Sequence, residues 1–234
     1  MSENLQQNRS YIQNVFDKVF DKYDLMNDLM SFGLHRNWKK NLINTIRPSK
    51  GHSLIDVACG TGDICKLFSD ATSNSSNILA VDSNIKMINK GKNKLYKYKN
   101  IKWKTCIAEN LDVEDESFDF YTISFGLRNT SDIQKTISEA NRVLKKGGRF
   151  LCLEFSKIEN DNLNSIYNNY TKIIPSIGKY IVGDKKPYEY LVKSIDEFLN
   201  QDELLEIMKK LNFYNCEYTN LNGGIVAIHS GWKI

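Results

Sequence analysis

Two glycines and two carboxylates gather around one predicted turn of the chain. Residues 54–64 are typical of a buried strand, a Gly60-Thr61-Gly62 turn and the start of a helix. Glycine permits positive φ and lets a ligand approach the backbone, and a helix N-terminus presents free N–H groups. The pattern is not the GxGxxG of dinucleotide sites, and Asp56 and Asp63 would repel a pyrophosphate. The turn instead suits a ligand end with both a carboxylate and an ammonium group, the N–H groups binding the first and Asp56 the second.

Further candidate ligand-binding residues lie at the ends of the following predicted strands. Asp82 closes the next strand, where a carboxylate can accept both hydroxyls of a ribose. Ile107 and Ala108 follow the third strand and are placed to line an adenine, while Ser124 ends the fourth. Carboxyl ends of parallel strands share one sheet edge, where ligands bind, so the pattern predicts an adenosine cofactor. The alternative is a tight strand-to-helix turn with Asp82 as a helix cap, and the combination of signals favours the cofactor.

The elements that would position these residues alternate between strand and helix. Strands are predicted over residues 53–58, 77–81, 101–107, 118–124 and 149–155, and helices over 63–68, 84–95 and 132–144. Such alternation predicts a parallel sheet that helices cover on both faces.

The two flanks of this core differ from it. Apolar residues at helical spacing predict two helices before it, over 15–23 and over 38–46, where Pro48 ends the pattern. After Phe155 the chain is predicted as helix and loop, with breaks at Pro175, Gly178, Gly183 and Pro187. A final helix over 201–211 precedes strands over 213–219 and 224–230. We expect an N-terminal helical extension over 1–50 and one domain over 51–234.

The overall composition excludes several classes of protein. The 234 residues are 41% hydrophobic and carry a net charge of only +4, which favours a globular domain and indicates no nucleic-acid partner. Five cysteines without a CxxC pair suggest neither a disulfide framework nor a metal site. The polar N-terminus does not resemble a signal peptide, and no apolar run is long enough to cross a bilayer. A soluble cytoplasmic protein is therefore the expectation.

Three longer blocks extend the cofactor pattern. They are residues 22–39 (KYDLMNDLMSFGLHRNWK), residues 124–129 (SFGLRN) and residues 142–157 (RVLKKGGRFLCLEFSK). With these blocks the chain resembles, over nearly its whole length, the UbiE family of ubiquinone/menaquinone-biosynthesis C-methyltransferases.

The resemblance implies a fold and a cofactor. The fold is the α/β, Rossmann-like class I S-adenosylmethionine (SAM) methyltransferase fold, a mostly parallel seven-stranded sheet with an antiparallel last strand. It also implies cofactor contacts at Thr61, Asp82, Ile107, Ala108 and Ser124, beside the turn glycines. Two positions depart from the family pattern: Cys59 replaces a frequent glycine, and Ile107 replaces a frequent asparagine, so a contact at 107 would be apolar or through the backbone.

For the reaction, the resemblance implies methylation of a ring carbon of a polyprenylated quinol. The acceptor would be of the 2-methoxy-6-polyprenyl-1,4-benzoquinol type, or demethylmenaquinol, or both. Arg128 and Asn129 follow the fourth strand and are predicted to orient the quinol oxygens or stabilise a phenolate. The alternative is that Arg128 pairs with a carboxylate and Asn129 caps the next helix. His35 is a weaker candidate for a base, and Tyr23 either covers the cofactor or packs its own helix.

Other functions are weighed against this one. A nucleic-acid or protein methyltransferase is disfavoured, because Ser124-Phe125-Gly126 stands where amino-directed base methyltransferases carry Asn/Asp-Pro-Pro-Tyr/Phe. A non-catalytic SAM-binding scaffold in a quinone-biosynthesis complex, or a methyltransferase for another small molecule, are further alternatives. Because a polyprenylated quinol resides in the bilayer, we also expect peripheral contact with the inner membrane surface through residues 179–181 and 185–188. Association with other quinone-biosynthesis enzymes, or alternatively a homodimer, is a further expectation.

Overall fold

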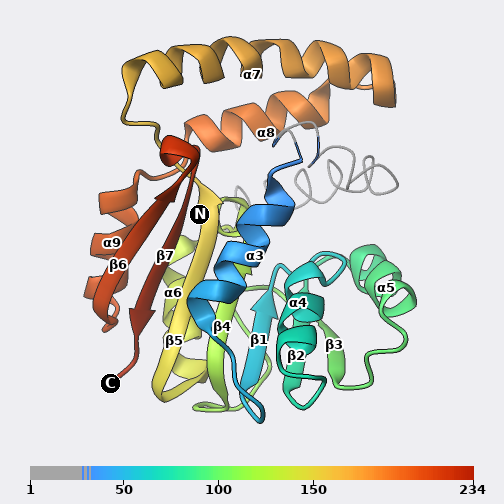
Figure 1. Cartoon of the computed structure of the whole chain (residues 1–234), viewed down its shortest axis with the longest axis vertical. Coiled ribbons are helices and arrows are strands. Elements are labelled where there is room, and N and C mark those ends of the chain that lie inside the picture. Colours follow the sequence, from blue (N-terminus) through green and yellow to red (C-terminus); the bar gives the residue numbers. More distant parts are fainter. Residues whose placement is uncertain (1–27, 29–30, 32) are drawn as a thin grey trace.

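A seven-stranded sheet forms the centre of the molecule (Figure 1). The computed structural model describes residues 28, 31 and 33–234. The strands are β1 Ser53–Val57, β2 Asn77–Asp82, β3 Ile101–Thr105, β4 Phe118–Ser124, β5 Leu144–Phe155, β6 Tyr214–Leu221 and β7 Val226–Trp232. Their order is β3-β2-β1-β4-β5-β7-β6, and only β7 runs antiparallel to its two neighbours. The predicted fold class is confirmed.

Helices cover both faces of this sheet (Figure 1). They are α3 His35–Ile46, α4 Asp63–Ala71, α5 Ile85–Lys94, α6 Ile133–Val143, α7 Asp161–Val182, α8 Lys186–Asp196 and α9 Gln201–Lys210, with short 3-10 helices η2 Leu127–Asn129 and η3 Asn222–Gly224. Successive strand residues point to opposite faces, so Leu54 joins one hydrophobic core and Ile55 the other. The first core contains α3 and α4, and the second contains α6 and α9.

The segment after β5 differs from the prediction. Pro175 and Gly178 do not break the chain, because both lie within the single helix α7. Gly178 instead permits close packing: a Cβ at this position would collide with the ring of Tyr188 on α8. Packing between α7 and α8 thus outweighs the local preference of both residues. The breaks predicted at Gly183 and Pro187 are confirmed, since Gly183 ends α7 with φ 85° and Pro187 lies in the first turn of α8.

The remaining differences are small. β5 begins at Leu144 rather than Arg149, with a register shift against β4 that accommodates residues 145–148. α3 ends at Ile46 before Pro48, as predicted. The helix predicted over 15–23, together with Tyr23, lies outside the described residues. Among the helices that are described, none is both long and apolar enough to span a membrane.

Candidate functional site

Two adjoining pockets lie at the carboxyl ends of β1, β2 and β4. The Asp82 pocket is bounded by Gly60, Asp82, Asn84, Met87, residues 106–109, Phe125, Gly126 and residues 129–131. The Asp56 pocket is bounded by Lys39, Asp56, Cys59, Gly60, Thr61, Asp63, Ser124 and Phe125. Ala58, Gly60 and Phe125 line both pockets, so together these form one elongated site.

The glycine turn separates these pockets and has the predicted left-handed backbone. Gly60 has φ 56° and Gly62 has φ 84°, a region that favours glycine. Of the cofactor residues predicted from the sequence, Gly62 is the one that borders neither pocket. It packs beneath them instead, because a Cβ at Gly62 would lie 2.6 Å from the ring of Trp103. Gly62 therefore serves the close approach of the turn to β3.

Asp82 connects the turn to the next helix. Its Oδ2 accepts from the backbone N–H of Gly60 at 2.8 Å, and its Oδ1 accepts from that of Asn84 at 2.9 Å. Burial raises the pKa of Asp82, and the two N–H groups oppose that rise. The N-cap of α5 is Asn84, whose side chain accepts from Lys86 and Met87, so the helix-cap alternative for Asp82 is not what the structure shows. These two bonds hold its carboxylate at the wall of the pocket.

The Asp56 pocket combines a buried carboxyl with an unpaired hydroxyl. Asp56 is only 1% exposed and accepts hydrogen bonds from the Thr122 hydroxyl at 2.7 Å and the Cys65 thiol at 3.3 Å. Burial raises its pKa to about 7, although the Thr122 bond opposes the rise. The Ser124 Oγ is buried and has no hydrogen-bond partner within the described part of the chain. A ligand group in this pocket could pair with the Ser124 hydroxyl, and the donors and acceptors here fit the methionine end of SAM.

Hydrogen bonds at both ends hold residues 106–109, the wall beside which the adenine is expected. The backbone N–H of Cys106 donates to the Asp82 carbonyl at 3.1 Å, and Glu109 accepts from the Ser131 N–H at 2.6 Å. Ile107 and Ala108 lie between these two anchors in the chain and line the pocket. The apolar side chains of Ile107 and Ala108 in this wall suit a nucleobase.

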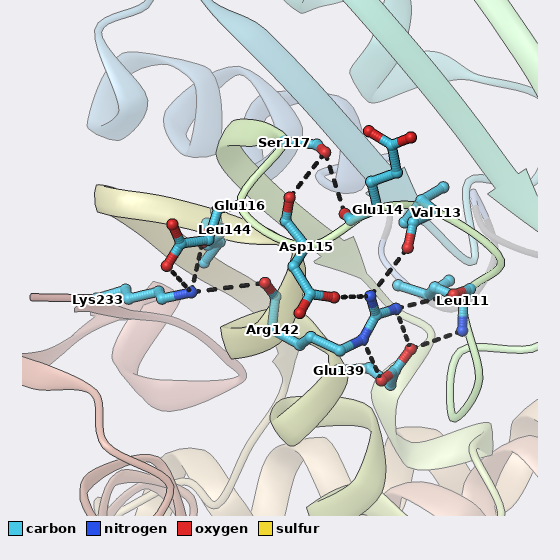
Figure 2. Close-up of polar contacts among 10 residues, drawn as sticks. All are labelled: Leu111, Val113, Glu114, Asp115, Glu116, Ser117, Glu139, Arg142, Leu144 and Lys233. Carbon is cyan, nitrogen blue, oxygen red and sulfur yellow. Dashed lines mark hydrogen bonds and ion pairs between the residues drawn. The ribbon is translucent and has the colours of Figure 1, made fainter.

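Arg142 of α6 holds the loop that continues from this wall (Figure 2). Its guanidinium donates to the carbonyls of Leu111 at 2.8 Å and Val113 at 2.9 Å, and to the carboxylate of Asp115 at 2.6 Å. Glu139 pairs with Arg142 at 2.8 Å and accepts from the Leu111 N–H at 2.7 Å. The sequence analysis singled out neither acid, and the signal that points to this role is the Arg142 block itself.

The side chains of the two residues predicted for catalysis, Arg128 and Asn129, lie in different environments. The Arg128 side chain is 4% exposed and forms an ion pair with buried Glu154 at 2.5 Å, with Phe125 O as a second acceptor at 3.0 Å. The alternative of a carboxylate partner is therefore the arrangement found for Arg128. Asn129 borders the Asp82 pocket, and its Oδ1 accepts from the Tyr190 hydroxyl at 3.0 Å. It does not cap α6, whose N-cap is Asp132.

His35 lies on α3 and is not among the residues that border either pocket. It is 4% exposed, its Nε2 is 3.0 Å from Asp28, and burial lowers its pKa. Sequence reasoning missed Lys39, which borders the Asp56 pocket, and it did not predict the hydrogen bond from Tyr190 to Asn129. Lys39 lies within the first family block, which was the available signal.

Comparisons with known proteins agree with this geometry. Residues 3–233 match the ubiE/COQ5 methyltransferase family. The chain is 48% identical over 233 residues to the Rickettsia bellii (strain OSU 85-389) ubiquinone/menaquinone biosynthesis C-methyltransferase UbiE, covering 97% of this chain and 94% of that protein. It is 50% identical over 230 residues to the protein of the same name from Rickettsia prowazekii (strain Madrid E), covering 95% and 92%.

Solved structures with distant sequences share the fold. A SAM-dependent methyltransferase from Thermotoga maritima, described as a possible histamine N-methyltransferase, superposes with a TM-score of 0.68 at 18% identity, covering 94% of this chain and 99% of that one. A SAM-dependent methyltransferase from Aquifex aeolicus has a TM-score of 0.66 at 17% identity, covering 97% and 98%.

Proposed function

Because the chain belongs to the ubiE/COQ5 methyltransferase family, we propose that it methylates a ring carbon of a polyprenylated benzoquinol or naphthoquinol. It is a SAM-dependent C-methyltransferase of ubiquinone/menaquinone biosynthesis, the activity named for the two Rickettsia proteins. The observation that carries the proposal is the pair of joined pockets, one lined by the Asp82 carboxylate and one by the buried Asp56 carboxyl and the unpaired Ser124 hydroxyl.

The residues of the chain divide the binding task between the pockets. Asp82 binds the ribose hydroxyls, Ile107 and Ala108 form the adenine wall, and Ser124 and Asp56 face the amino-acid end. When bound, SAM supplies an electrophilic methyl group on its sulfonium. The protein then contributes alignment and exclusion of water.

On the acceptor side, we assign different roles to Arg128 and Asn129. Asn129 borders the Asp82 pocket with its amide held by the Tyr190 hydroxyl, so we propose that it orients a quinol hydroxyl beside the bound cofactor. Arg128 acts as a positioning residue: its ion pair with Glu154 and its bond to Phe125 O hold the Phe125–Asn129 loop against β5. Substituting Asn129→Ala is expected to lower the rate of methyl transfer while leaving SAM affinity nearly unchanged.

A methyl-transfer assay tests the proposed activity. Isotope from methyl-labelled SAM should appear on the ring carbon of a short-chain quinol acceptor when the reduced quinol is supplied. SAM binding without any transfer to benzoquinols or naphthoquinols would favour the non-catalytic scaffold instead. Transfer to a different class of acceptor would support the methyltransferase activity but contradict the quinol as its substrate.

The acceptor resides in a bilayer, and one face of α7 suits contact with it. Ile166, Ile173 and Tyr180 are spaced seven residues apart along this helix and are 68%, 55% and 94% exposed. Exposed Lys172 and Lys179 flank them, so an apolar stripe with basic neighbours faces outward. Such a stripe fits the headgroup region of anionic lipid.

Part of the segment predicted for membrane contact has another role. Tyr188 is fully buried between α7 and α8, and Lys185 pairs with Glu189 at 2.8 Å. The membrane proposal therefore rests on the α7 stripe.

Liposome co-sedimentation tests this surface. The parent protein should bind anionic vesicles at low salt and be released at high salt, and the variant Ile166→Ser/Ile173→Ser/Tyr180→Ser should not bind. A matched control, Tyr96→Ser, changes an exposed aromatic residue in the loop after α5, outside the stripe, and should bind normally. Concentration-dependent dimerisation that the triple variant abolishes, without vesicle binding by the parent, would assign the stripe to a second copy.

A further inference from the structure

Lys39 brings the N-terminal helix α3 to the cofactor site. Its neighbours Trp38 and Leu42 are buried in the core, which fixes the helix against the rest of the fold. The Lys39 side chain is only 12% exposed and borders the Asp56 pocket, which buried Asp56 and Ser124, with its unpaired hydroxyl, also line. A lysine in that position extends the site beyond the strand ends.

Two lysines share one carboxylate at the mouth of this pocket. Asp63 lies 2.8 Å from the Lys39 ammonium and 2.7 Å from that of Lys94. Burial by itself would raise the pKa of Asp63, but the two lysines outweigh it and hold that pKa well below its usual range. Asp63 is therefore ionised and holds both ammonium groups at the mouth of the pocket.

The two lysines differ in access to the pocket. Lys94 is 38% exposed, also donates to the Thr61 hydroxyl at 3.2 Å, and is not among the residues that border the pocket. Lys39 does border the pocket, and it is the only cationic side chain among the residues that line it. The charged partner of an incoming carboxylate is therefore Lys39.

On this basis, and resting on the proposed function, we propose that Lys39 binds the carboxylate of the methionine part of SAM while it keeps its contact with Asp63. Asp56 then faces the ammonium group of the same cofactor, so the two charges of the amino-acid end meet opposite charges on α3 and β1. Recognition of that end thus depends on the N-terminal helix as well as on the sheet.

Calorimetric binding of two ligands to the whole protein tests this assignment. Decarboxylated SAM keeps the sulfonium and the ammonium and lacks only the carboxylate. The parent protein should prefer SAM over it. Lys39→Met should weaken SAM binding by about tenfold to a hundredfold, because a charge-assisted hydrogen bond is lost, and leave decarboxylated SAM within about twofold. Lys39→Arg should restore most of the preference for SAM.

Lys94→Met is the matched control, since it removes the other lysine bonded to Asp63. Any loss of affinity in this variant should be the same for both ligands. Equal weakening of both ligands by Lys39→Met, or an unchanged SAM affinity, would overturn the assignment. If Lys39→Met does not fold, Lys39→Gln provides the same comparison. Failure of the parent protein to bind either ligand would instead contradict the proposed function.

Discussion

The buried carboxyl of Asp56 makes a measurable prediction about stability and pH. Its pKa rises from 3.8 to about 7 in the folded protein, mainly because burial disfavours the charged form. Below pH 3.8 both folded and unfolded chains hold the proton. Between that pH and about 7 the unfolded chain has lost it while the folded chain keeps it, so stability falls as pH rises. Above about pH 7 the loss is complete.

The magnitude follows from the same shift. One pKa unit corresponds to about 1.4 kcal/mol, so a shift of about three units costs about 4 kcal/mol at pH 8. Asp56→Asn removes the ionisation but keeps an oxygen that accepts from the Thr122 hydroxyl. The variant should match the parent in stability near pH 4 and exceed it by up to about 4 kcal/mol at pH 8.

Urea denaturation of both proteins at pH 5, 6.5 and 8 measures this difference. The quantity that matters is the gap in unfolding free energy between variant and parent, which cancels the titration of the other groups. A gap that stays constant from pH 5 to 8 would refute the reasoning, because Asp56 would then be ionised throughout that range.

Cofactor binding provides a second reading of the same group. An ammonium beside Asp56 favours its charged form, so SAM binding near pH 6.5 should release a proton from the parent protein. Calorimetry in two buffers of different ionisation enthalpy detects that proton. Asp56→Asn should release less of it and bind SAM about tenfold to a hundredfold more weakly.

Three further substitutions test other parts of the site. Asp82→Ala should weaken SAM binding by about tenfold to a hundredfold in calorimetry, because the ribose loses a charged acceptor, and an unchanged dissociation constant in a folded variant would remove Asp82 from the site. Glu154→Gln should destabilise the fold by about 3–5 kcal/mol in urea, because it leaves the Arg128 guanidinium buried without its counter-charge. The double variant Arg128→Met/Glu154→Met should recover much of that loss. Arg142→Met should weaken adenosine-ligand binding about fivefold by loosening the loop behind the adenine wall, and equal affinity would show that the loop is held by other contacts.

The sequence by itself determined the element order and the cofactor end of the site. Period-two and period-3.6 patterns located the strands and most helices, and parallel strands necessarily bring Gly60, Asp82, Ala108 and Ser124 to one edge. These are local or topological properties, so reading along the chain was sufficient. The helix breaks predicted at Pro175 and Gly178 were wrong, because packing between α7 and α8 outweighs the local preference of these residues.

Only the tertiary structure decided how charges are paired around that edge. Arg128 and Glu154 are 26 residues apart in the chain, yet they form a buried ion pair, which separates Arg128 from the role predicted for it. Lys39 and Asp63 are 24 residues apart and meet at the pocket mouth. The sequence names the charged residues, but which of them touch depends on how helices pack across the sheet. From the sequence, any given carboxylate could be an ion-pair partner or a ligand contact, and only its distance to other groups in the folded protein distinguishes the two roles.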